Sequence, residues 1–209
     1  MLTRLSGQGL KKVFNRRVIF EDVSFSIRQQ ETLLITGPNG SGKSTLVRII
    51  GSVLTPTSGT VSLVGERVEV RESPHFTFGL VSPYLQMYDE FTPRENLQFA
   101  LAVRGLKRWF PTIQPLLEKV QLAGRLDDPV RTFSSGMRQR VKYAFALVHR
   151  PAALILDEPM ANLDASGIEL VKQIMREQLE NGMLIVSTND TTDVDRYDAQ
   201  VELGRRPQA

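Results

Sequence analysis

The chain has 209 residues, of which 41% are hydrophobic and 23% are charged, so it is long enough for one substantial core and has an ordinary globular composition. The net charge of +3 is small, and the basic residues near the N-terminus are expected to form a solvated face, so no nucleic-acid partner is expected. The sequence has no apolar signal segment and no run of about 18 apolar residues, so any membrane role requires a partner. The absence of cysteine excludes disulfides and thiolate metal sites and fits a reducing, cytoplasmic setting.

The N-terminal part of the chain has the pattern of strands. Residues 2–14 alternate loosely between apolar and polar side chains, and residues 18–27 alternate in part. The apolar run at residues 32–36 predicts a further strand.

A helix and shorter strands are expected next. Residues 43–54 carry apolar side chains on more than one face, which predicts a buried helix that ends at residues 56–59. Residues 60–64 and 67–70 alternate around a Gly-Glu pair and predict a short hairpin. Residues 80–81 end another short strand.

A helical segment follows a short loop. Thr92 is expected to cap a helix and Glu95 to complete a capping box. The sequence has no strand pattern for some distance after this point, and at least two helices are expected there, separated by Pro111 and Pro115.

The remaining segments alternate between helix and strand. Ser134 or Ser135 is expected to cap the next helix. The wholly apolar run 153–156 predicts a strand buried on both faces of a parallel sheet. A helical apolar stripe at 169–180 and a strand at 183–187 follow it. The alternation predicts a mostly parallel α/β sheet.

Between the strand at 32–36 and the next helix, residues 37–45 read GPNGSGKST. With these flanks, the G-x-x-x-x-G-K-[ST] pattern indicates a loop that binds a nucleoside triphosphate. The glycines let backbone N–H groups surround phosphate oxygens at a helix N-terminus, Lys43 adds a positive charge, and the Ser44 hydroxyl can bind Mg²⁺. The alternative is a glycine-rich loop before an ordinary helix. The expected nucleotide-binding residues are Gly37, Pro38, Asn39, Gly40, Ser41, Gly42, Lys43, Ser44 and Thr45.

Two acidic residues follow the strand at 153–156, in the string Asp157-Glu158-Pro159. A carboxylate at a strand end is the second element that a phosphate-loop enzyme needs, because it faces the metal and the attacking water. Asp157 is expected to hold Mg²⁺ directly or through water, and Glu158 to accept a proton from the water that attacks the terminal phosphate. Alone, such a string is usually a strand entering a turn; after the phosphate loop it indicates a hydrolytic site.

Four strings in this order resemble those of the ATP-binding subunits of ABC transporters. They are residues 37–45, FSSGMRQR at 133–140, Asp157-Glu158-Pro159, and NLD at 162–164. The resemblance covers nearly the whole chain. It implies an α/β P-loop NTPase (RecA-like) fold, with a mostly parallel sheet flanked by helices, a small N-terminal antiparallel β part and an inserted helical subdomain. It also implies one domain over 1–209, with a core at 1–81 and 137–209 and the helical subdomain at 82–136.

The resemblance further implies a dimer, in which each ATP and its Mg²⁺ lie between the phosphate loop of one copy and the signature string of the other. Ser134, Ser135 and Gly136 would contact the partner copy's ATP, and Asp164 would lie in the loop that couples the two sites. Helix capping is the alternative role for Ser134, and both roles are compatible. ATP hydrolysis would drive a separate integral membrane subunit, which places the chain in the cytoplasm on the inner face of the cell membrane.

Two departures from the family pattern affect the signature and the loop that couples to the membrane subunit. Phe133, Ser135 and Met137 replace three of the five residues of the usual signature Leu-Ser-Gly-Gly-Gln. Pro83 stands where the family has a glutamine in the coupling loop. Gln86, three residues further on, is the candidate to take over that role, including contact with Mg²⁺.

A third departure is Asn189, in the place of the histidine that holds the terminal phosphate and the catalytic carboxylate in the family. Asparagine can donate a hydrogen bond to phosphate but cannot become a cation, so hydrolysis is expected to be slow and to depend on Glu158. The histidines, His75 and His149, are each expected to be surface or packing residues. Phe14 matches the aromatic residue on which the family stacks adenine; the alternative is a core role.

Three functions remain open at this point. A transport ATPase is favoured, because Glu158 is intact. The altered signature and Asn189 suggest a slow or non-hydrolysing nucleotide-dependent regulatory module as the alternative. A soluble ABC ATPase acting on ribosomes or DNA usually has two ATP domains or a long coiled-coil insertion, and this chain has neither. The length of the chain and the string LDASG at 163–167 are similar to the haem-exporter subgroup used in cytochrome c maturation.

Overall fold

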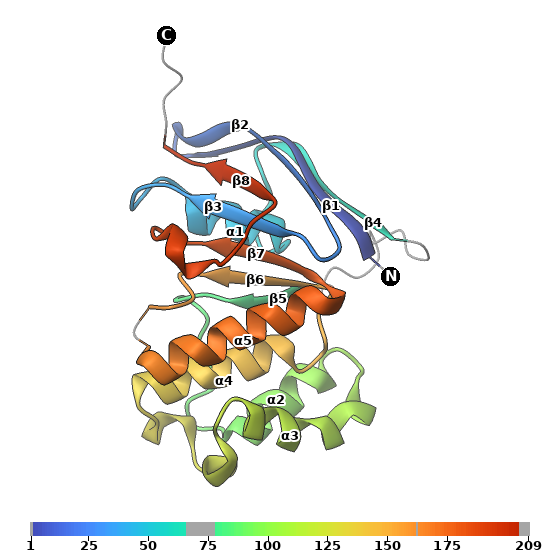
Figure 1. Cartoon of the computed structure of the whole chain (residues 1–209), viewed down its shortest axis with the longest axis vertical. Coiled ribbons are helices and arrows are strands. Elements are labelled where there is room, and N and C mark those ends of the chain that lie inside the picture. Colours follow the sequence, from blue (N-terminus) through green and yellow to red (C-terminus); the bar gives the residue numbers. More distant parts are fainter. Residues whose placement is uncertain (1, 66–77, 162, 205–209) are drawn as a thin grey trace.

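The structure is a computed structural model that describes residues 2–65, 78–161 and 163–204. The strands are β1 (Leu2–Phe14), β2 (Arg17–Arg28), β3 (Thr32–Thr36), β4 (Ser58–Gly65), β5 (Phe78–Val81), β6 (Ala153–Asp157), β7 (Met183–Ser187) and β8 (Ala199–Glu202). The helices are α1 (Lys43–Ile50), α2 (Pro93–Ala102), α3 (Ile113–Lys119), α4 (Ser135–Leu147) and α5 (Ala165–Asn181). Within these ranges the strands form an antiparallel sheet, in the order β2-β1-β4, and a parallel sheet, in the order β5-β6-β7-β3-β8 (Figure 1).

The antiparallel sheet is built on a long hairpin of β1 and β2, which confirms the two N-terminal strands. Its turn contains Asn15 and Arg16, which have φ values of 48° and 66°. On its other edge, β1 pairs with β4. The first strand of the hairpin expected at residues 60–70 is therefore present, with β1 as its neighbour, and the second strand lies outside the described residues.

The parallel sheet confirms the α/β class. Every residue of β3, β6 and β7 is buried, as expected for strands covered on both faces. The three strands end together, since Asp157 lies beside Ser187 and Ser187 beside Ile35 in the strand register. This edge of the sheet therefore collects the side chains that follow three different strands. The sequence did not indicate β8, which is only four residues long and buries Val201 but not its neighbours Gln200 and Glu202.

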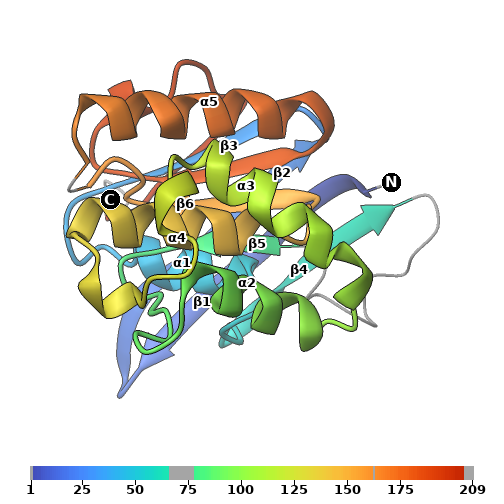
Figure 2. The ribbon, with the colours of Figure 1, turned by 90° about the horizontal axis from the view of Figure 1, so that it is seen from below.

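Different elements cover the two faces of the parallel sheet. On one side, α1 and the inner face of the antiparallel sheet pack on β3, β6 and β7, with Leu5, Phe25, Leu46 and Ile50 in a shared core. On the other side, α4 and α5 lie against the sheet, and α2 and α3 lie beyond them (Figures 1 and 2). The elements α2 and α3 lie inside the segment expected to form the helical subdomain. The division of the chain into a core and a subdomain stays a prediction.

The helix boundaries correct three expectations. Helix α1 ends at Ile50 rather than at residue 54, because Gly51 closes it and Ser52 adopts a φ of 58°. Val53 is 65% exposed instead of buried. The two helices expected here are present as α2 and α3, and Pro111 lies between them in the 3₁₀ segment Lys107–Thr112. Pro115 does not separate helices, because it lies in the first turn of α3, where the missing N–H leaves no bond unmade. The capping box at the start of α2 is confirmed, since Thr92 and Glu95 bond to each other's backbone N–H.

Candidate nucleotide-binding and catalytic site

The loop between β3 and α1 has a backbone that only glycine allows at three places. Gly37, Gly40 and Gly42 have φ values of 141°, 79° and 104°. A Cβ on Gly37 would lie 2.3 Å from the Leu203 carbonyl oxygen, and one on Gly42 would lie 2.6 Å from Ile19 Cγ2. Among the residues that the structure describes, no side chain caps the N-terminus of α1, so its first N–H groups are available to an anion. The loop therefore has the shape and polarity of a phosphate cradle.

Lys43, the first residue of α1, places its ammonium group at the centre of the site, with only 6% of the residue exposed. Its Nζ donates to the Gly37 carbonyl at 2.8 Å and to Asn189 Oδ1 at 2.6 Å, and lies 3.7 Å from Glu158 Oε1. Asn189 Nδ2 in turn donates to Asn39 Oδ1 at 2.7 Å. The structure thus brings together the phosphate loop, the residue after β6 and the segment after β7.

Asp157, the last residue of β6, is 1% exposed. Neither of its carboxylate oxygens has a hydrogen-bond partner among the described residues. A buried carboxylate without partners is costly, and such a group is found where a cation or a functional ligand balances it. Ser44 lies in the first turn of α1, which packs against β6. A carboxylate and a hydroxyl at this place are the hard oxygen donors that Mg²⁺ prefers, so the residues fit the expected metal.

Glu158 begins the loop after β6 with a φ of 51°, a strained value for a residue with a side chain, and its N–H donates to the Ser187 carbonyl at 2.8 Å. Burial raises the pKa of the Glu158 carboxyl; Lys43 lowers this pKa, while Asp157 and Asp193 raise it further. A carboxylate with a raised pKa is a better proton acceptor near neutral pH. Its position beside Lys43 suits the role of a base at the terminal phosphate.

Two hollows border these residues. One, of about 600 Å³, opens beside the phosphate loop and is lined by residues that include Pro38, Asn39 and Asn189. The other, of about 420 Å³, lies between α4 and the loop after β5. Pro83, Gln86, Ser135, Lys142 and Glu158 are among the residues that line it. The structure therefore places Pro83 and Gln86 in the same pocket as the candidate base.

The signature string forms the N-terminus of α4. Ser134 caps this helix and accepts a hydrogen bond from the Met137 N–H at 3.3 Å, which confirms the capping role. Ser134 and Ser135 are exposed. A Cβ added at Gly136 would meet nothing within 4 Å, so the helix end is open on this side. It presents N–H groups at the surface, where an anion from a second molecule can reach them.

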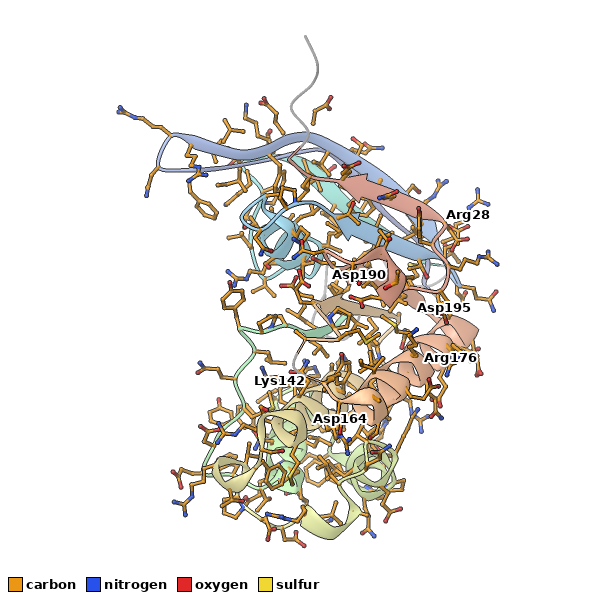
Figure 3. The ribbon with its side chains drawn as sticks, turned by 60° about the vertical axis from the view of Figure 1, so that its left-hand side comes forward. Arg28, Lys142, Asp164, Arg176, Asp190 and Asp195 are labelled. Carbon is orange, nitrogen blue, oxygen red and sulfur yellow. The ribbon has the colours of Figure 1, made fainter. Side chains whose placement is uncertain are left out.

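Asp164 caps α5 by accepting the Gly167 N–H at 2.7 Å, and Figure 3 shows it at the start of that helix. Arg140 Nη2 lies 3.9 Å from Asp164 Oδ1 and donates to Ser166 Oγ at 3.0 Å. Arg140, from the signature helix, thus joins α4 to the start of α5. Sequence reasoning named the string that contains Arg140 but gave it no role; its place one turn after Gly136 was the available signal.

Phe14 and His149 resolve two open alternatives. Phe14 is 43% exposed at the tip of the β1–β2 hairpin, and Lys12 Nζ lies 4.8 Å from its ring centroid, so the core role is wrong. His149 is buried and its Nε2 lies 3.0 Å from the Phe78 carbonyl oxygen, which is the packing role that was expected. His75 lies outside the described residues.

Comparison with known proteins identifies the family. The ABC transporter family model matches residues 20–161. The chain is 35% identical to the lipoprotein-releasing system ATP-binding protein LolD 1 of Caulobacter vibrioides, over 91% of this chain and 88% of that protein. It is 33% identical to the Nod factor export ATP-binding protein I of Ralstonia nicotianae, over 88% of this chain but only 58% of that longer protein. A solved structure of the ATP binding subunit of an ABC transporter superposes with a TM-score of 0.84 and 30% identity, covering 96% of this chain and 86% of that one.

The described helices include none that is both long and apolar enough to cross a membrane. The family model covers more than half of the chain, and the solved subunit has the same fold over nearly all of it. The chain therefore belongs to the ABC transporter family, as an ATP-binding and ATP-hydrolysing subunit.

Proposed function

We propose that two copies of this chain close around two ATP molecules, hydrolyse them with Glu158 as the base, and thereby drive an integral membrane transporter subunit. The observation that carries this proposal is the convergence of Gly37, Glu158 and Asn189 on the Lys43 ammonium, with the three contacts at 2.6–3.7 Å. Residues from three strand ends meet at the one cation that the phosphate loop provides. A site of this kind holds a triphosphate and places a carboxylate beside it.

The phosphate loop and Lys43 bind the β- and γ-phosphates, and Ser44 and Asp157 hold Mg²⁺. When bound, Mg²⁺ neutralises charge on the phosphate oxygens. Asp157 suits this role because it is buried with both oxygens unpartnered among the described residues, so no protein contact has to break before it binds a cation. Gln86 is the candidate for an additional metal contact from the loop after β5.

Glu158 accepts the proton of the water that attacks the γ-phosphorus. The water oxygen forms the new bond to phosphorus, the bond to the β–γ bridging oxygen breaks, and ADP and phosphate leave. The raised pKa of Glu158 supports this role. Asn189 Nδ2 donates to Asn39 Oδ1 in the structure. When ATP is bound, the same N–H group donates to an oxygen of the γ-phosphate. Because the amide stays neutral, it adds no positive charge to the transition state.

The second half of each site comes from the partner copy. Ser134, Ser135 and Gly136 lie at an open helix N-terminus, whose N–H groups suit a γ-phosphate. Asp164 lies next to this end of α4 through its contact with Arg140. Phe14, exposed at the hairpin tip, is the candidate platform for adenine.

An exposed aromatic surface is the candidate contact for the membrane subunit. Tyr88 packs its ring on Phe99 with the centroids 5.1 Å apart, and the Arg48 guanidinium lies 4.6 Å from the Tyr84 ring centroid. Val103, which caps the C-terminus of α2 one turn after Phe99, is also exposed. Such a patch on a water-exposed face marks a protein contact. The location that we propose on this basis is the cytoplasm, at the inner face of the cell membrane.

The proposal is tested by steady-state ATP hydrolysis of the purified chain. The rate per molecule is expected to rise with protein concentration, because each site needs two copies, and Glu158→Gln is expected to bind ATP and Mg²⁺ without turning ATP over. A matched control is Glu180→Gln, at the exposed end of α5. Undiminished turnover by Glu158→Gln would contradict the role of Glu158. A rate per molecule that is independent of concentration across the dimer range would contradict the shared site.

A further inference from the structure

Two consecutive residues of α4 contact the loops that follow two adjacent strands. Lys142 Nζ lies 3.5 Å from the Ser82 carbonyl oxygen and 3.4 Å from that of Pro83, in the loop after β5. Tyr143 Oη donates to the Pro159 carbonyl at 2.9 Å, in the loop after β6. Because β5 and β6 are neighbours in the parallel sheet, one turn of α4 holds both loops at the same edge (Figure 3 marks Lys142 on this helix).

The Tyr143 contact is a buried hydrogen bond. The residue is 1% exposed, and burial raises the pKa of its hydroxyl, so the group stays a neutral donor at every physiological pH. Its acceptor, Pro159, is the next residue after Glu158. Breaking this bond would remove the hydrogen-bond donor of the buried Pro159 carbonyl, so the bond persists when α4 moves. A displacement of α4 is therefore transmitted to the loop that carries the base.

The Lys142 contact is longer than that of Tyr143. It is an attraction between the charged ammonium group and two carbonyl dipoles. Lys142 is half-buried, and burial lowers the pKa of its ammonium group. It makes no ion pair within the part of the chain that the structure describes, and the carbonyls of Ser82 and Pro83 accept from its ammonium group. The Ser82 carbonyl also accepts the Leu85 N–H at 3.1 Å, which closes the turn that Lys142 touches. Lys142 thus holds the backbone at Pro83. This is the position at which the family has the glutamine of the coupling loop, and proline has no side-chain amide to make contacts.

The loop held by Lys142 and the base share one pocket, since Pro83, Lys142 and Glu158 all line the hollow of about 420 Å³. Ser134, at the N-terminus of the same helix, lies about two turns before Lys142. A single rigid helix therefore joins the candidate contact with the partner's ATP to both loops.

We infer that Lys142 and Tyr143 are positioning residues that tie the signature end of α4 to the Glu158 loop and to the loop at Pro83. This inference rests on the proposed function, because it requires α4 to meet ATP bound by the partner copy. Neither residue touches ATP. When α4 shifts against that ATP, both loops shift with it, and the base of one site responds to the nucleotide of the other. Loss of either contact lowers the rate at which bound ATP is hydrolysed, without weakening ATP binding at residues 37–45.

The test compares Tyr143→Phe, Lys142→Met and Lys142→Arg with two matched controls. Tyr197→Phe removes the hydroxyl of an exposed tyrosine, and Lys172→Met removes the charge of a half-buried lysine on α5. For each variant, kcat and KM for ATP, the affinity for a fluorescent ATP analogue and the thermal midpoint are measured. Tyr143→Phe and Lys142→Met are expected to lower kcat by about three- to tenfold while KM and analogue affinity stay within about twofold of the wild-type values. Lys142→Arg keeps the positive charge and is expected to retain the wild-type kcat. Both control variants are expected to match the wild type.

An unchanged kcat in both Tyr143→Phe and Lys142→Met would overturn the inference. So would a fall in kcat that is matched by the loss of analogue binding and of thermal stability, because a packing role alone produces that pattern. Failure of the proposed function has a different signature: the wild type would then show no hydrolysis that depends on Glu158. The Lys142→Met and Lys142→Arg pair keeps the test decisive if Tyr143→Phe does not fold.

Discussion

The ammonium group of Lys43 and the side-chain oxygen of Asn189 lie 2.6 Å apart, and the amide nitrogen of Asn189 donates to Asn39 at 2.7 Å. The side-chain amide of Asn189 therefore contacts the phosphate loop through both of its polar atoms: its oxygen contacts Lys43 and its nitrogen contacts Asn39. A neutral imidazole could accept from Lys43 or donate to a phosphate, and its charge would change with pH near its ordinary pKa. Asn189 performs both contacts with no change in charge.

Replacement of Asn189 tests this relationship. Asn189→Ala removes both contacts and is expected to lower kcat by about tenfold or more, because Lys43 and the γ-phosphate lose a positioning partner. Asn189→His is expected to retain hydrolysis and to gain a pH-dependent step in kcat at about pH 6.5 that the wild type lacks. Both are measured as pH–rate profiles at saturating ATP. Identical profiles for wild type and Asn189→His would argue against contact between this side chain and the reacting phosphate.

Because the carboxylate of Asp157 is buried, its replacement by an amide is expected to raise the stability of the chain and to abolish its activity. Asp157→Asn removes a charge that has no partner among the described residues, so we expect the free energy of unfolding without Mg²⁺ to rise by about 1–3 kcal/mol. The same change is expected to abolish hydrolysis, because the neutral amide is a poor ligand for Mg²⁺. Denaturant titration in a chelator and an ATPase assay measure the two effects. An unstable Asp157→Asn would show that a protein contact, rather than a metal, satisfies this carboxylate.

The raised pKa of Glu158 sets the acidic limb of the pH–rate profile. As the proposed base, Glu158 must be ionised, so kcat is expected to fall as pH drops through a value above the ordinary 4.5. Asp193 contributes to the raised pKa through its negative charge. Asp193→Asn is therefore expected to move the acidic limb to lower pH, and the exposed Asp127→Asn to leave it in place. A shift of this limb to higher pH in Asp193→Asn would have the wrong sign.

His149 predicts a pH dependence of stability. Burial lowers its pKa from 6.5 to about 4, with the nearby charge of Arg104 acting in the same direction. The unfolded chain therefore binds a proton between these values while the folded chain does not, so the stability contributed by neutral His149 is lost as pH falls from 6.5 toward 4. His149→Gln, which keeps a donor for the Phe78 carbonyl, is expected to flatten this part of the stability curve. Equal slopes for the two proteins in denaturant titrations would exclude this role.

The sequence was sufficient for the strands and glycines that build the phosphate cradle, because wholly apolar strands and a left-handed backbone leave strong local signals. Asp157 and Glu158 were also predictable from the sequence, since they end a buried strand. The end of α1 was not: the apolar pattern continues to residue 54, while Gly51 and the positive φ of Ser52 end the helix earlier. Strand β8 gave no clear signal because it is only four residues long and buries a single side chain, that of Val201.

The contacts between distant segments could not be obtained from local patterns. Lys43 and Asn189 are 146 positions apart, and their contact depends on β3 and β7 being neighbours in the sheet. The roles of Lys142 and Tyr143 depend in the same way on where α4 crosses the ends of β5 and β6. In the sequence these residues are only a polar and an aromatic position on a helix.

The shared ATP site is tested most directly by mixing two inactive variants. Lys43→Ala removes the charge of the phosphate loop, and Gly136→Glu blocks the open end of α4 where a Cβ meets no other atom within 4 Å. Each variant alone is expected to be inactive, since both of its sites are defective. In a mixed dimer one site combines an intact phosphate loop with an intact signature. Random mixing is therefore expected to restore activity to at most about a quarter of the wild-type rate, and to less than this because the base of the intact site also responds to the nucleotide at the defective one. A mixture that stays as inactive as its components, or a fully active Gly136→Glu, would contradict the account.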